Sequence, residues 1–150
     1  MSSETRTPRE GEALDAGTLC EWLRASLPEA RGELSIRQFP GGASNLTYLI
    51  TVGDRQYVLR RPPFGTKAAT AHDMEREYRI LSALRPVFPY CPRPVLWCGD
   101  ETVLGEPFYL MERLEGTVLR RELPEGLELT RGDAESLCRN LLDVLLELHQ

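Results

Sequence analysis

The stretch Phe39-Pro-Gly-Gly-Ala-Ser-Asn-Leu-Thr-Tyr48, followed by Tyr57-Val-Leu-Arg-Arg61, decides the fold. It predicts two strands joined through a turn of small residues, and a cation at the end of a buried strand further along the chain. The two adjacent glycines lack a Cβ, so the backbone can take positive φ and approach a ligand closely. Successive N–H groups in such a turn can form an anion-binding nest. The stretch therefore predicts an anion-binding turn, and an ordinary hairpin turn is the alternative.

Length and composition indicate one globular domain. The chain has 150 residues, of which 41% are hydrophobic and 27% charged, and no apolar run is long enough to span a membrane. Residues 1–14 are polar, lack the apolar segment of a signal peptide and are expected to form a disordered lead-in. The net charge of −5 argues against nucleic acid as a partner. We expect a cytoplasmic protein without a membrane partner.

The cysteine, histidine and lysine content of the chain limits the kinds of binding or catalytic site that we expect. The four cysteines are scattered and form no C-x-x-C pair: Cys20, Cys91, Cys98 and Cys138. Reduced thiols are therefore expected. His72 and His149 lie far apart, so no metal site or Ser/His/Asp arrangement is expected. Lys67 is the only lysine beside 17 arginines, which suggests a GC-rich, bacterial genome. Any phosphate-pairing cation should therefore be an arginine unless it is Lys67.

Hydrophobic periodicity predicts an α+β fold. The expected elements are a helix over 15–27, strands over 34–39, 46–52 and 56–61, a helix over 70–84, strands near 95–97 and over 107–112, a polar linker over 116–126, and a closing amphipathic helix. Five antiparallel strands with one helix inserted after the third form the N-lobe of a protein-kinase-like fold.

The chain resembles the aminoglycoside phosphotransferase (APH) family, in particular the branch fused to acyl-CoA dehydrogenases. Four segments carry the resemblance in order over 39–116: the two quoted above, Ala71-His-Asp-Met-Glu-Arg-Glu-Tyr-Arg-Ile-Leu81, and Gly105-Glu-Pro-Phe-Tyr-Leu-Met-Glu112 with Gly116. The resemblance implies a kinase-like N-lobe over 15–115. Residues 116–150 would then be the inter-lobe linker and the first helix of a truncated C-lobe.

The resemblance also nominates a phosphate-pairing cation and its carboxylate. Arg60 ends the third strand, where the family places the cation. Strand alternation points Arg60 and Arg61 to opposite faces, so only one of them can serve. Glu77 fits the helix carboxylate that pairs with this cation, seven residues before Leu84. Glu75 is the competing candidate, and each of these charges could instead be a solvated surface group.

The remaining site residues would contact the nucleotide. The residues expected to cover its phosphates are Gly41, Gly42, Ala43, Ser44 and Asn45. Met111 would line the base pocket, and the Glu112 carbonyl and the Leu114 N–H would hold the base. A plain edge strand is the alternative for this last segment.

The resemblance implies a small-molecule kinase that transfers the γ-phosphoryl group of ATP or GTP to a hydroxyl, aided by Mg²⁺. This chain contains no His-Gly-Asp-type catalytic loop and no metal-binding aspartate, so we expect no catalytic residue or metal ligand within it and no activity of the chain alone. The acceptor could be a hydroxyacyl thioester, as suggested by the dehydrogenase-fused branch. Choline-like and sugar hydroxyls stay open, and an aminoglycoside is less favoured.

Two readings from other classes stay open. A polypeptide that ends at Gln150 would be a non-catalytic nucleotide-binding or protein-interaction module. It could self-associate through the apolar stripe of the closing helix, which consists of Leu137, Leu141, Leu142, Val144, Leu145 and Leu148. The other reading is an α+β domain without a nucleotide site.

Overall fold

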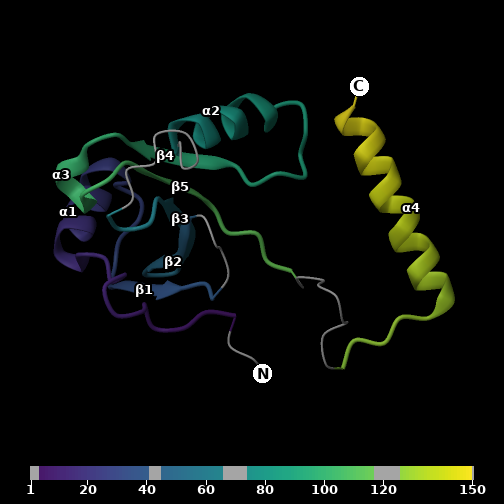
Figure 1. Cartoon of the computed structure of the whole chain (residues 1–150), viewed down its shortest axis with the longest axis horizontal. Helices are drawn as coiled ribbons and strands as arrows, with labels where there is room; N and C mark the ends of the chain where they lie inside the picture. Colours follow the sequence, from purple (N-terminus) through teal and green to yellow (C-terminus); the bar gives the residue numbers. More distant parts are fainter. Residues whose placement is uncertain (1–3, 41–44, 66–73, 117–125, 150) are drawn as a thin grey trace.

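The fold is built around a five-stranded antiparallel sheet (Figure 1). The computed structural model describes residues 4–40, 45–65, 74–116 and 126–149. The strands are β1 Leu34–Gln38, β2 Leu46–Val52, β3 Arg55–Arg61, β4 Pro94–Cys98 and β5 Phe108–Glu112, in the order β1-β2-β3-β5-β4. The helices are α1 Ala16–Ser26, α2 Met74–Leu84, α3 Glu101–Leu104 and α4 Arg131–Leu148. The predicted α+β class, with one helix between the third and fourth strands, is confirmed.

A tight turn fixes the register of β2 and β3. The two strands pair from Leu46↔Arg61 to Val52↔Arg55. Gly53 makes this turn with φ +60°, a conformation that side chains with a Cβ rarely adopt. Because side chains alternate between the faces of a strand, this register decides which end-of-strand arginine faces which side of the sheet.

One face of the sheet carries the apolar core. Leu19 and Leu23 of α1 are fully buried there, together with Leu59 of β3. The ring of Trp22 meets that of Phe108 edge to face, with centroids 4.9 Å apart. Helix α1 is amphipathic and covers this face because its leucines recur at helical spacing.

Helix α2 packs on β4 and β5. Met74 at its start is buried, and the Tyr78 ring lies 6.0 Å from Trp97 and 6.1 Å from Tyr109. These contacts hold the first turn of α2, which carries Glu77, above the central strands.

The short helix α3, between β4 and β5, is not among the elements predicted from the sequence. The Asp100 carboxylate accepts hydrogen bonds from the backbone N–H and the hydroxyl of Thr102. These bonds lower the pKa of Asp100. Gly105 ends the helix with φ +83°. A helix of four residues is too short for hydrophobic periodicity to reveal it.

Residues 4–14 do not form the disordered lead-in expected over 1–14. Arg6 pairs with Gln38 of β1 through two backbone hydrogen bonds of 2.7 and 2.8 Å. Leu14 is buried, and the Tyr48 hydroxyl donates to the Glu12 carbonyl at 2.6 Å. Burial raises the pKa of Tyr48 to about 12. The polar composition of this segment conceals a backbone pairing with the sheet edge.

Helix α4 stands apart from the sheet (Figure 1). Thr130 and Asp133 form a capping box at its start. Its large exposed apolar residues are Leu141, Leu142, Leu145, Leu146 and Leu148. No helix in the described part of the chain has both the length and the apolar character needed to cross a bilayer.

We expect Gly53→Ala to destabilise the protein more than Gly105→Ala does. Both residues have positive φ, but a Cβ at Gly53 would lie 2.3 Å from the Arg31 carbonyl oxygen, whereas nothing lies within 4 Å at Gly105. Backbone strain alone costs about 1–3 kcal/mol, and the contact with a fixed carbonyl adds to it at Gly53. Urea unfolding of both variants checks the order, and equal losses would contradict the role given to this contact.

Candidate functional site

The centre of the candidate site is the Glu77 carboxylate, which approaches the guanidinium of Arg60. Arg60 Nε lies 3.3 Å from Glu77 Oε2, and Nη2 donates to Oε1 at 3.4 Å. The Nε contact is electrostatic, because Nε is buried and not aligned for a hydrogen bond. Both side chains keep about a third of their surface exposed, 32% for Arg60 and 33% for Glu77. The structure therefore brings together the two residues nominated as cation and carboxylate.

Two further side chains hold Glu77. Asn45 Nδ2 donates to Oε1 at 2.9 Å, and the Tyr109 hydroxyl donates to Oε2 at 3.0 Å. Tyr109 is 1% exposed, and this burial raises the pKa of its hydroxyl, to which the adjacent Glu77 charge adds. The tyrosine therefore stays a neutral donor to a carboxylate. Residues from β3, from β5 and from the position just before β2 thus meet on one carboxylate of α2.

Arg61 lies elsewhere, as strand alternation requires. Its side chain is 1% exposed, and Nη1 donates to the Leu104 carbonyl at 2.9 Å. Nε donates to the Pro62 carbonyl at 3.0 Å, and the guanidinium lies 3.6 Å from the centroid of the Phe64 ring. Burial lowers the pKa of Arg61. These contacts make Arg61 a structural cation and leave Arg60 as the arginine of the site.

The competing carboxylate is not at the site. Glu75 is exposed and lines an open groove on the outer side of α2 with Arg76, Arg79 and Ile80. Between the two acidic residues of this turn, the structure places only Glu77 beside Arg60.

Apolar side chains continue the same face of the sheet. The strand register places Thr47, Arg60 and Tyr109 in one row across β2, β3 and β5. The next row on this face consists of Leu49, Val58 and Met111. Leu49 and Val58 are buried, and Met111 is half-buried. A polar row thus adjoins an apolar row, an arrangement that suits a ligand with a charged end and a flat apolar end.

The segment after β5 is tied to the rest of the molecule by side chains. Arg113 pairs with Glu4 Oε2 at 3.0 Å and donates to Gln56 Oε1. Leu114, nominated for its N–H, has an exposed side chain. Glu112 is held by two arginines that the sequence did not single out.

The predicted phosphate-covering loop lies mostly outside the described residues. Gly41, Gly42, Ala43 and Ser44 lie outside the described residues, so only Asn45 of the predicted phosphate-covering loop is seen. In the described ranges, no cluster of three or more His, Cys, Asp or Glu residues is arranged to hold a metal ion.

Tyr109 was the residue that sequence reasoning missed. It lies two residues before Met111 and so shares its strand face. That spacing is visible in the sequence. The position of Tyr109 opposite Arg60, however, depends on β5 lying next to β3, and the order of strands is set by tertiary packing.

We predict that Tyr109→Phe lowers the free energy of unfolding by roughly 1.5–3 kcal/mol, because it removes a buried hydrogen bond to a charged group. Tyr57→Phe is the control, since Tyr57 is also buried and its hydroxyl has no protein partner within the described ranges. It should cost less than about 0.5 kcal/mol. Chemical denaturation measures both, and equal effects would show that the Tyr109–Glu77 bond adds nothing.

Known proteins resemble this chain in sequence and in fold. The model of the phosphotransferase enzyme family (APH) matches residues 35–150. Acyl-CoA dehydrogenase family member 10 from Mus musculus is 37% identical over 97% of the chain, and family member 11 from Gallus gallus is 35% identical over 97%. A crystal structure from Ralstonia eutropha, assigned provisionally as an aminoglycoside phosphotransferase, is 32% identical with a TM-score of 0.61 over 77% of this chain.

The chain spans only part of these proteins. It covers 14% of the mouse protein, 19% of the chicken protein and 32% of the Ralstonia chain. The sheet with one inserted helix matches a kinase-like N-lobe, as predicted. The resemblance drawn from the four sequence segments is likewise confirmed by the family match and by the dehydrogenase relatives. The chain belongs to the phosphotransferase enzyme family.

Proposed function

We propose that this chain is the nucleotide-binding part of a small-molecule kinase that transfers the γ-phosphoryl group of ATP or GTP to a hydroxyl. The observation that carries the proposal is the Arg60–Glu77 pair, which lies beside the apolar row ending at Met111. A nucleotide carries both a polyanionic and an aromatic end, and the two rows offer one partner for each.

The residues present fit a triphosphate. Within the described ranges Arg60 Nη1 has no acceptor, and a third of the side chain is exposed. A guanidinium matches phosphate oxygens with a rigid fork of donors. Hydrogen bonds from Asn45 and Tyr109 hold the Glu77 carboxylate toward the guanidinium of Arg60. In this position Glu77 would orient Arg60. When bound, the nucleotide would supply the phosphoryl group that is transferred.

Each residue then has a distinct role. Arg60 would neutralise charge on the phosphates, and Glu77 would fix the direction of the guanidinium. Residues 41–45 would cover the phosphates. Met111 would contact the base, while the Glu112 carbonyl and the Leu114 N–H would read its edge. The chain itself would contribute binding and orientation, and the phosphoryl transfer would need groups outside it.

The family resemblance suggests an acceptor class and a metal ion for the complete enzyme. A hydroxyacyl thioester is the acceptor class we favour, because the similar proteins from mouse and chicken are named as members of the acyl-CoA dehydrogenase family. Mg²⁺ would be held by residues outside this chain. Self-association through α4, a cytoplasmic location, a bacterial origin and the boundaries 15–115 and 116–150 stay predictions.

Arg60→Ala should weaken ATP binding roughly 10- to 100-fold, since a charge-assisted hydrogen bond contributes about 1.5–3 kcal/mol. Calorimetric titration with ATP measures this change. Arg60→Lys keeps the charge but not the fork, and should fall between the parent protein and Arg60→Ala.

Arg55→Ala is the matched control, because Arg55 lies at the exposed other end of β3. It should bind ATP like the parent protein. An Arg60→Ala variant that folds normally and retains full ATP affinity would overturn the phosphate-binding role.

A further inference from the structure

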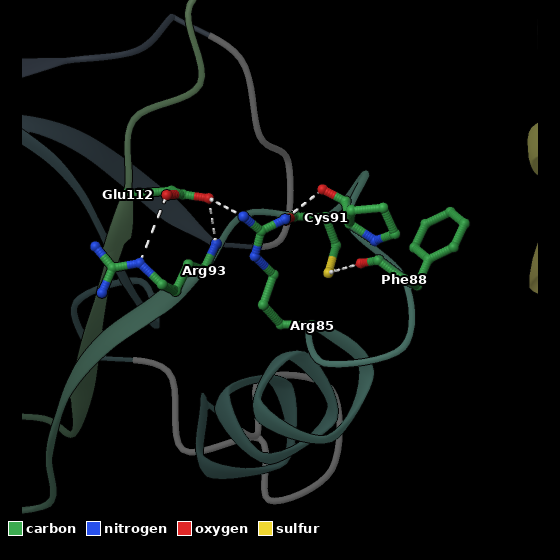
Figure 2. Close-up of polar contacts among 6 residues, drawn as sticks. Arg85, Phe88, Cys91, Arg93 and Glu112 are labelled. Carbon is green, nitrogen blue, oxygen red and sulfur yellow. Dashed lines mark hydrogen bonds and ion pairs between the residues drawn. The ribbon is translucent and has the colours of Figure 1, made fainter.

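The side chain of Glu112 is fixed on three sides (Figure 2). Its Oε1 accepts a hydrogen bond from the backbone N–H of Arg93 at 2.8 Å and lies 3.6 Å from Arg85 Nη2. Its Oε2 lies 3.7 Å from Arg93 Nε. The backbone N–H of Glu112 also donates to the Arg93 carbonyl at 2.9 Å. Both the side chain and the backbone of this residue are therefore anchored.

Arg85 links this carboxylate to the connection between α2 and β4. Its Nη1 donates to the carbonyls of Pro89 and Cys91, the second at 3.2 Å, while Nη2 faces Glu112 (Figure 2). The thiol of Cys91 in turn donates to the Phe88 carbonyl at 3.3 Å. The guanidinium of Arg85 thus contacts two segments: Nη1 binds the connection between α2 and β4, and Nη2 faces Glu112 at the end of β5.

The position of Arg85 in the chain connects Glu112 to helix α2. It directly follows Leu84, the last residue of α2, and Glu77 lies in the first turn of the same helix. The backbone hydrogen bonds along the helix fix its two ends at a set distance from each other. Helix α2 therefore contacts Arg60 through Glu77 near its start, and the residue that follows the helix, Arg85, contacts Glu112 at the other side of the candidate site.

We propose that Arg85 is a positioning residue for base recognition, which acts through Glu112 and couples the place of the backbone at 112–114 to that of α2. This inference rests on the proposed function, because it assumes that the backbone there holds a base. Arg93 is the weaker partner: its side chain is 60% exposed, against 33% for Arg85, and its shortest contact comes from its backbone.

The first test needs no nucleotide. Hydrogen–deuterium exchange of the full natural protein is compared between the parent, Arg85→Ala and two controls, Arg93→Ala and Arg79→Ala. Arg79 is an exposed arginine on α2, away from Glu112. We expect Arg85→Ala to accelerate exchange of the amides at 112–114 at least fivefold, and the controls to change it less than twofold. Unchanged exchange there, or an equal increase throughout α2 and the sheet, would overturn the proposal.

The second test separates base from phosphate. Dissociation constants are measured for ATP, GTP and inorganic tripolyphosphate. Arg85→Ala should weaken binding of the preferred nucleotide about five- to tenfold and leave tripolyphosphate within twofold, whereas Arg60→Ala should weaken both. Equal losses for nucleotide and tripolyphosphate in Arg85→Ala would mean that Arg85 has only a structural role.

A double variant tests the route. If Arg85 acts through Glu112, Arg85→Ala combined with Glu112→Gln should lose no more nucleotide affinity than the stronger single variant. Additive losses would overturn the route through Glu112. Failure of the parent protein to bind either nucleotide would overturn the proposed function and the base-recognition role with it, while the exchange result would still decide whether Arg85 positions 112–114.

Discussion

The rest of the site depends on the need to satisfy one half-buried carboxylate. Glu77 projects from α2 onto the sheet, and a charge placed there without partners would be costly. Arg60 of β3, Tyr109 of β5 and Asn45, which directly precedes β2, meet that need. Because the three donors come from separate segments of the chain, all of them can reach the carboxylate only when β3, β5, the start of β2 and α2 are correctly placed relative to one another.

Local patterns in the sequence predicted most of the fold. Strands were predicted over 34–39, 46–52 and 56–61, and the structure has them at 34–38, 46–52 and 55–61. The pairing of Arg60 with Glu77 was expected from the family resemblance. What could not be predicted depends on tertiary contacts: the four-residue α3, the pairing of Arg6 with Gln38, and Tyr109 as a partner of Glu77. None of these leaves a periodic signal, since each depends on which segments become neighbours in space.

The backbone after β5 illustrates the same limit. Its sequence nominated Glu112 for a main-chain group, yet the structure gives its side chain a separate task through Arg85 and Arg93. Arginine is suited to this place because a fork of donors can satisfy a carboxylate and nearby carbonyls together. Helix α2 and this segment are thereby joined by side chains as well as by the chain itself.

The two neighbouring arginines of β3 have opposite surroundings, one open to solvent beside Glu77 and one buried against carbonyls and the Phe64 ring. Side chains alternate along a strand, so a deletion of one residue in the β2–β3 hairpin would turn each arginine to the opposite face of the sheet. The protein should therefore tolerate substitutions in this hairpin far better than insertions or deletions. Length in this segment, more than composition, is what selection has to preserve.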